Sequence, residues 1–171
     1  MIGPTLTTPR LKLRPPQADD WPAFAAFMAS ERAQYVGGPA DIGKAWRAFG
    51  HVAGHWVLRG FGSFVFTRRD NDSALGLTGP WYPADWPEHE IGWTVWDPDA
   101  EGQGLAAEAA AHAREHAYTA LGWTTAVSYI APANARSIAL AQRLGAVLDT
   151  AADAPDDTAL VYRHPAPGTA A

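Results

Sequence analysis

Apolar side chains recur every three or four residues in four segments of the chain, which is the spacing that predicts helices. These segments cover residues 21–30, 42–58, 105–120 and 134–144. Start and stop signals flank them: Asp20, Asp41 and Asn134 stand at N-cap positions, and Gly122 and Gly145 stand just past the helix ends. The four helices are therefore bounded by the sequence itself.

Short runs rich in β-branched and aromatic residues separate these helices and predict strands. They cover residues 11–14, 62–69, 74–82, 89–96, 124–130, 146–150 and 158–164. The strands joined by short turns should be antiparallel, whereas a helix connects 89–96 to 124–130, and such a crossover predicts a parallel pair. The order of elements predicts a mixed α+β (α/β) sheet with helices on its faces. The length of 171 residues predicts one domain over 1–171, with an ordered core of about 6–165 and a flexible tail at 166–171.

Composition excludes several classes of protein. The net charge is −5 and no Lys/Arg cluster is present, so we expect no nucleic-acid partner. The absence of cysteine excludes disulfides, thiolate metal sites and cysteine nucleophiles. The N-terminal segment lacks the apolar region of a secretory signal, and no stretch is apolar enough to span a membrane. We therefore expect a cytoplasmic protein with no membrane partner.

The stretch from 99 to 117, DAEGQGLAAEAAAHAREHA, places two glycines directly before a predicted helix. The first turn of a helix presents unpaired N–H groups, and glycine lets an anion approach the backbone without meeting a Cβ. This layout predicts an anion site formed by Gly102, Gln103, Gly104, Leu105 and Ala106. A tight turn without a ligand is the alternative reading.

Two other motifs in this stretch are incomplete. Gly102-x-Gly104-x-x-Ala107 matches a dinucleotide-binding fingerprint, but no acidic residue follows about 20 residues later, and the Gly-Lys-Ser/Thr of a P-loop is absent. His112, Glu115 and His116 match the H-x-x-E-H pattern of some zinc peptidases. That pattern needs a third ligand from a later Glu, and no Glu follows Glu115. We therefore expect no metal.

Three stretches, in this order, resemble a known family: TPRLKLRPPQADD, EIGWTVWDPDAEGQGLAAEA and NARSIALAQRLGA. Together they resemble N-acetyltransferases of the GNAT superfamily, and specifically the RimJ/RimL-like branch that acetylates N-termini of ribosomal proteins. The resemblance spans residues 8–164. It implies a GNAT fold: a mixed, mostly antiparallel sheet of about seven strands, with a splayed central parallel pair and four helices on its faces.

The resemblance also implies acetyl-CoA as co-substrate and assigns residues to it. The pantetheine arm would lie along the central strand, the diphosphate on the glycine turn, and further contacts on a helix. The implied residues outside the turn are Thr94, Val95 and Trp96 for the arm, Asn134 for the arm, and Arg143 for a phosphate. Glu101 stands where the family motif R/Q-x-x-G-x-G/A usually has Arg or Gln. Its carboxylate would repel a diphosphate unless it turns to solvent.

Acetyl transfer to an amine needs a base, because an alkyl amine is mostly protonated at neutral pH. Glu90 on the central strand is the first candidate, followed by Glu88 and then His89. Ser137 matches the serine of the family's N-x-x-S motif, which would hydrogen-bond the leaving thiolate; supporting the helix cap is the alternative. Tyr129 is a second candidate donor, or a core residue.

An aromatic and acidic segment suggests where the amine binds. The candidate acceptor residues are Trp81, Asp85, Trp86 and Glu88, because aromatic faces and carboxylates suit a cationic amine. An aromatic lid on the sheet is the alternative. Two functions follow: direct acetyl transfer to a protein N-terminus or small amine in a ternary complex, or a non-catalytic acyl-CoA sensor. Dimers are common in this branch, so a homodimer is one expected assembly.

Overall fold

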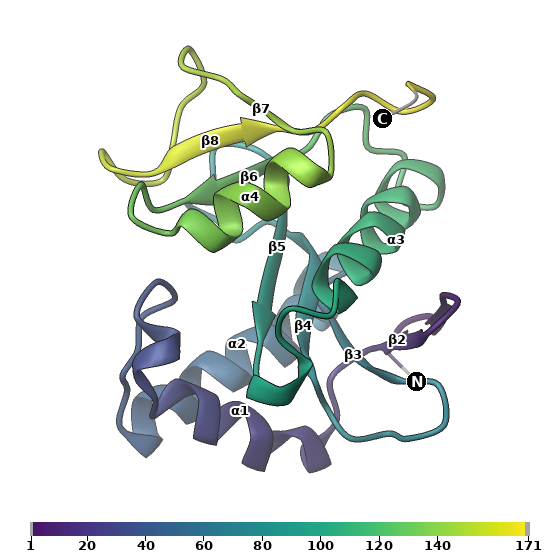
Figure 1. The fold of residues 1–171 in the computed structure, drawn as a ribbon, viewed down its shortest axis with the longest axis vertical. Helices are drawn as coiled ribbons and strands as arrows, with labels where there is room; N and C mark the ends of the chain where they lie inside the picture. The colour runs from purple at the N-terminus through teal and green to yellow at the C-terminus, as the bar shows by residue number, and fades with distance from the viewer. Residues whose placement is uncertain (1, 170–171) are drawn as a thin grey trace.

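The computed structural model describes residues 2–169, which form one eight-stranded sheet and four α-helices (Figure 1). The strands are β1 (Leu6–Thr7), β2 (Leu11–Arg14), β3 (Phe64–Arg68), β4 (Gly76–Trp81), β5 (Glu90–Val95), β6 (Val127–Ile130), β7 (Val147–Leu148) and β8 (Leu160–Arg163). The α-helices are α1 (Trp21–Met28), α2 (Ile42–Arg59), α3 (Leu105–Thr119) and α4 (Ala135–Arg143). Three 3₁₀ turns accompany them, η1 (Ala18–Asp20), η2 (Glu31–Ala33) and η3 (Pro98–Ala100).

The strand order is β1-β2-β3-β4-β5-β6-β8-β7, and every neighbouring pair except β5–β6 is antiparallel. The predicted mixed sheet with its single parallel pair is thus confirmed. The strand count is eight rather than about seven, because Leu6–Thr7 adds a two-residue edge strand. A strand of two residues is too short to leave a periodic pattern in the sequence.

The sheet is almost divided between β5 and β6. These strands share one Cα pair, Glu90 with Val127, and the Val127 N–H donates to the His89 carbonyl at 3.0 Å. Beyond this pair the two strands diverge, so β6, β8, β7 and α4 stand apart from the other half, with β5 between them (Figure 1). We call this divergence the seam.

Helices cover both faces of the larger half. Val65 points to α1 and α2 and packs with Phe24 and Phe49, whereas its neighbours Phe64 and Phe66 point to the opposite face and pack with α3. Successive strand residues face opposite sides, and all three of these β3 residues are fully buried. The middle of the sheet is therefore held rigidly between two helical layers.

Two of the three predicted N-cap side chains make the expected hydrogen bond, and the third does not. Asp41 accepts the Lys44 N–H at 2.8 Å, and Asn134 accepts the Ser137 N–H at 3.2 Å, as predicted for N-caps. Asp20 holds the N-cap position of α1 as predicted, but its side chain makes no cap hydrogen bond there. Its carboxylate instead accepts the Gln17 N–H, which belongs to the turn η1 before the helix, and a hydrogen bond from the buried Arg14.

Within residues 2–169 no helix is long and apolar enough to cross a membrane. The predicted flexible tail begins with a turn in which the Thr169 N–H donates to the Ala166 carbonyl at 3.2 Å. The last two residues of that tail lie outside the described residues.

Candidate active site

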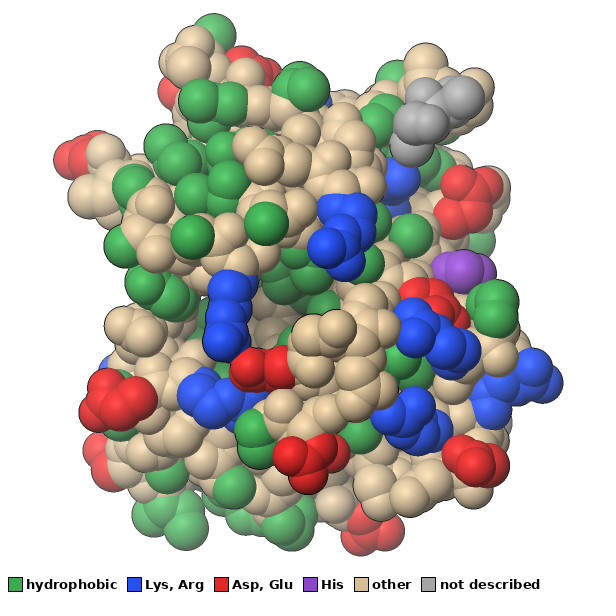
Figure 2. Space-filling view, in the orientation of Figure 1, with side chains coloured by type: hydrophobic (Ala, Val, Ile, Leu, Met, Phe, Trp, Pro, Cys, Tyr) green, Lys and Arg blue, Asp and Glu red, His purple; other side chains and the backbone are tan. Residues whose placement is uncertain are grey.

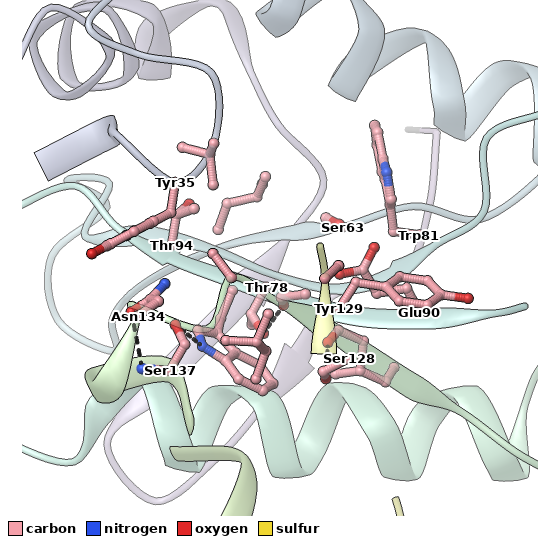
Figure 3. A pocket seen from close by; sticks show the side chains of 18 of the residues that line it. Tyr35, Ser63, Thr78, Trp81, Glu90, Thr94, Ser128, Tyr129, Asn134 and Ser137 are labelled. Carbon is pink, nitrogen blue, oxygen red and sulfur yellow. Dashed lines mark hydrogen bonds between the residues drawn. The ribbon is translucent and has the colours of Figure 1, made fainter. Parts of the chain in front are cut away.

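A cavity of about 580 Å³ lies at the seam, where the two halves of the sheet separate. Its lining comes from α1, α2, β4, β5, β6, α4 and the loop before β8. The sequence-predicted residues that line it are Trp81, Trp86, Glu90, Thr94, Tyr129, Asn134 and Ser137. Figure 3 shows Trp81, Glu90 and Tyr129 together at one end, and Thr94, Asn134 and Ser137 at the other. Residues distant in the sequence thus form one site with two ends.

Glu90 begins β5, at the pair that joins the two halves. Its carboxylate accepts a hydrogen bond from the Trp86 indole N–H. Burial raises the pKa of Glu90 to about 7, against the opposing hydrogen bonds from Trp86 and from the Tyr129 backbone. A carboxyl group with this pKa can take up and release a proton near neutral pH, which suits a general base.

The two alternative bases are engaged elsewhere. Glu88 is bound by both terminal nitrogens of Arg163 at 2.8 and 2.9 Å, and the hydrogen bond from Arg163 lowers its pKa. His89 stacks on Trp123 at 4.2 Å between ring centroids, and burial lowers its pKa. Neither residue lines the cavity. Glu88 also lies outside β5, in the loop that precedes Glu90.

The hydroxyl of Ser137 is available to a ligand. It accepts the Trp93 indole N–H at 3.1 Å, so its own proton is free to be donated. The cap of α4 uses the Ser137 backbone N–H and the side-chain Oδ1 of Asn134, which leaves the side-chain N–H₂ of Asn134 for another partner. The two roles considered for Ser137 are therefore compatible, because they use different atoms.

Tyr129 is a further donor at the Glu90 end. Its hydroxyl accepts the Glu88 N–H at 3.2 Å and keeps its proton, and burial raises its pKa to about 12. At neutral pH it is a hydroxyl that can donate a hydrogen bond into the cavity, whose lining includes it.

An unpaired strand edge faces the seam. The carbonyls of His89 and Ile91 point to β6, so backbone groups of Trp93 and Val95 point to the same side. Trp96 points the other way: its N–H and that of Asp97 both donate to the Leu75 carbonyl, at 2.8 and 3.1 Å, which makes a bulge. Of the predicted arm-binding backbone, Val95 therefore faces the seam with a free side only at its N–H, because its carbonyl accepts a hydrogen bond from Arg32 at 2.8 Å, and the Trp96 N–H points to β4.

The glycine turn has the geometry of an open cradle. Gly102 and Gly104 have φ of +72° and +73°, and a Cβ at Gly102 would meet no atom within 4 Å. Leu105 and Ala106 open α3, so the helix itself offers no acceptor one turn earlier for their backbone N–H groups. N–H groups at a helix N-terminus that directly follows two glycines fit a diphosphate, so the turn suits the predicted cofactor.

The carboxylate of Glu101 does not simply turn to solvent, because two arginines bind it. Arg32 and Arg136 each bind its carboxylate at 2.6 Å. Burial opposes ionisation of Glu101, but these two arginines outweigh it and lower its pKa. The negative charge beside the turn is therefore neutralised, and neither arginine was among the residues predicted from the sequence.

The remaining predicted residues lie away from the cavity. Asp85 is exposed in the loop before β5, and Arg143 is exposed at the end of α4. His116 packs its ring edge-on against Phe64, and the Nδ1 of His112 lies 3.0 Å from the carbonyl of Glu108. In the described part of the chain no three His, Cys, Asp or Glu side chains gather to hold a metal ion.

A buried network at the seam was not predicted. Arg114 donates to the Nδ1 atom of His164 at 3.0 Å, so the proton of that ring is on Nε2, 2.8 Å from the Ser128 hydroxyl. Ser128 in turn donates to the Ile91 carbonyl at 2.6 Å. Burial lowers the pKa of His164 to about 3, so the ring is neutral. The network ties β6 to β5 just where their backbone pairing ends.

Comparisons with known proteins identify the family. Residues 10–147 match the model of the acetyltransferase (GNAT) domain. The crystal structure of an acetyltransferase from Agrobacterium tumefaciens str. C58 is 40% identical, with a TM-score of 0.89, and the match covers 95% of this chain and 94% of that one.

Two more distant structures share the fold. RimL, a ribosomal L7/L12 alpha-N-protein acetyltransferase in complex with coenzyme A, is 18% identical (TM-score 0.67; 94% of this chain, 96% of that one). The ribosomal-protein-S5-alanine acetyltransferase from Vibrio fischeri is 12% identical (TM-score 0.66; 95% of each chain). With the splayed sheet, the cavity at its seam and the glycine turn, these matches lead to one conclusion: the chain belongs to the GNAT family of acetyltransferases.

Proposed function

We propose that the protein transfers an acetyl group from acetyl-CoA directly to a primary amine, with both substrates bound at the seam. The observation that carries this proposal is the two-ended cavity. Glu90, with a pKa near 7, stands at one end, and Ser137 and Asn134 stand at the other, next to an unpaired strand edge (Figure 3). This arrangement supports a base for the amine at one end and a binding site for the thioester arm at the other.

The cofactor arm would lie along the β5 edge. The backbone groups of Trp93 and the N–H of Val95 can bond to an extended amide chain as an added strand would, while the Val95 carbonyl is bound by Arg32. N–H groups of the glycine turn and of the first turn of α3 would bind the diphosphate, and the Asn134 amide would contact the arm. In this position the thioester reaches the cavity beside Ser137.

Transfer then follows from the residues around the thioester. The ammonium group loses one proton to the Glu90 carboxylate, and the neutral nitrogen forms a bond to the acetyl carbon. The carbon–sulfur bond then breaks as the second proton leaves the nitrogen for the departing sulfur, which gives the amide and free coenzyme A. A backbone N–H of the β5 edge can stabilise the charge that develops on the carbonyl oxygen. The free hydroxyl proton of Ser137 can hydrogen-bond the departing thiolate, with Tyr129 as the second donor.

The acceptor end suits a cationic amine. Within the described residues the cavity lining contains no Lys or Arg, while it contains two carboxylates, Glu90 and Asp156, and the indoles of Trp81 and Trp86. Carboxylates and aromatic faces attract an ammonium group before it is deprotonated. Both a protein N-terminus and a small amine meet this description.

Release of free thiol from acetyl-CoA on addition of an amine panel tests the proposal. The panel should contain peptides with free N-termini, polyamines and amino acids. Amine-dependent thiol release, lost in the Glu90→Gln variant, is the expected result. Tight binding of acetyl-CoA without turnover of any amine would instead favour a sensor domain of the same fold.

A further inference from the structure

Two ion pairs join three separate segments across the open end of the seam. Arg32 lies in η2, Glu101 just before the glycine turn, and Arg136 in the first turn of α4. Glu101 bridges the two arginines at 2.6 Å on each side. Figure 2 shows basic and acidic side chains meeting at the edge of a hollow on this face. We call these three residues the strap, because they tie the smaller half of the sheet to the larger one.

The two arginines are held unequally. Arg32 also donates to the carbonyls of Val95 and Trp96, at 2.8 and 2.7 Å, so it has a fixed structural position. Arg136 makes one hydrogen bond from its side chain, to Glu101, and that side chain is 84% exposed. Loss of the Glu101 contact would therefore free Arg136 while Arg32 stays in place.

The strap carries one net positive charge next to the N–H groups of 102–106. A guanidinium binds a phosphate with the same two-pronged geometry as a carboxylate, and a diphosphate brings more negative charge than one carboxylate. Glu101 immediately precedes Gly102, so its carboxylate and a diphosphate on the turn would repel each other. The two anions compete for the same two guanidinium groups.

We propose that Arg32 and Arg136 bind the diphosphate of an acyl-CoA, and that Glu101 holds both guanidinium groups in the free protein until the diphosphate displaces it. This inference rests on the proposed function, since it concerns the same cofactor. It assigns Glu101 a competing role: the residue keeps the arginines positioned and lowers the affinity for the cofactor.

Calorimetric titration with coenzyme A tests the strap in the wild type and three variants. We expect Arg136→Gln to weaken binding about tenfold, the size of one charge-assisted hydrogen bond, and Glu101→Gln to tighten it about threefold or more. Arg47→Gln, which removes an exposed arginine on α2, should leave the affinity unchanged. Circular dichroism melts show whether each variant is folded.

Two analogues of coenzyme A show whether the changes in affinity depend on the diphosphate. Dephospho-coenzyme A keeps the diphosphate, so it should show the same changes, whereas S-acetylpantetheine lacks it and should bind all variants alike. Equal affinity of wild type, Glu101→Gln and Arg136→Gln for coenzyme A would overturn the proposal. So would changes that vanish with dephospho-coenzyme A.

The strap and the catalytic proposal can fail separately. Altered binding in the expected directions without any thiol release would support the strap and reject the transferase. Thiol release with unchanged binding would reject the strap alone. If no variant binds coenzyme A, both are rejected.

Discussion

The two halves of the sheet are built differently. Strands β1 to β5 are paired along their lengths and enclosed by helices on both faces, with Phe64 and Phe66 fully buried. Strands β6, β8 and β7 form a smaller unit that meets the larger one at a single backbone pair and through side chains such as Ser128 and Arg163. The rigid half thus supplies a fixed edge, and the incomplete pairing supplies the cavity.

The largest expected effect comes from removing the Glu90 carboxylate, which lies where the two halves of the sheet meet. Glu90→Gln should lower kcat by about 10²–10⁴-fold, the usual contribution of a general base. Steady-state thiol release at pH 8 measures it. Glu88→Gln is the matched control, two residues away: it loses an ion pair with Arg163 and should lower the melting temperature while leaving kcat within a few-fold.

Stability provides a check that Glu90→Gln is folded. The pKa of Glu90 lies near 7 in the folded protein, above the ordinary value of 4.5, so ionisation there opposes folding as pH rises from about 4.5 to 7. The Gln variant should therefore melt above the wild type at pH 8, and the difference should disappear near pH 4. A variant that melts lower at pH 8 would contradict this account of Glu90.

A pH profile gives the next largest effect. If Glu90 is the base, kcat at saturating substrates should rise with pH through about 7, because only the ionised carboxylate accepts a proton. Two pH units below that, kcat should be about 100-fold lower, since one proton blocks the reaction. A profile that is flat between pH 5 and 8 would exclude Glu90.

Breaking the link between the halves tests the seam itself. Ser128→Ala leaves the buried N–H of His164 and the carbonyl of Ile91 without a partner, which should cost about 1–3 kcal/mol of unfolding free energy in urea titrations. The KM for acetyl-CoA should rise as well, because the edge of the cofactor groove loosens. Thr67→Val, a buried hydroxyl loss inside the larger half, should reduce stability without changing that KM.

The smallest expected change in activity comes from replacing Trp86, whose indole N–H donates to the Glu90 carboxylate. Trp86→Phe removes the indole N–H that bonds the Glu90 carboxylate, and that bond favours the charged form. The rising limb of the kcat profile should therefore move to higher pH, with a loss of a few-fold at pH 7. An unchanged limb together with a raised KM for the amine would make Trp86 purely an acceptor residue.

Local signals in the sequence were sufficient for most of the fold. Caps such as Asp41 and Asn134 and stops such as Gly145 act within one helical turn, so they could be recognised without knowing the tertiary structure. Asp20 was placed correctly at the start of α1, but its side-chain partner was not predictable from local signals, because the carboxylate forms a buried ion pair with Arg14 in a strand.

Sequence motifs predicted residues that the fold brings to one cavity, whereas contacts between distant segments could not be predicted. Glu90, Asn134 and Ser137 lie in recognisable stretches, and all three line the cavity. Arg32 and Arg136 are ordinary surface residues in sequence terms, and they become significant only because folding brings both to Glu101, 69 and 35 residues away. The spacing of these residues in the sequence does not indicate that they will be in contact.

The single backbone pair between β5 and β6, Glu90 with Val127, has a consequence for the dynamics of the protein. Proteins open in cooperative units whose boundaries follow the weakest connections. Residues 124–164 are linked to the rest by few main-chain bonds, so their amide hydrogens should exchange with deuterated water as a separate unit, ahead of those in β3 and β4. Ligand that spans the junction would bond to both sides and slow that exchange.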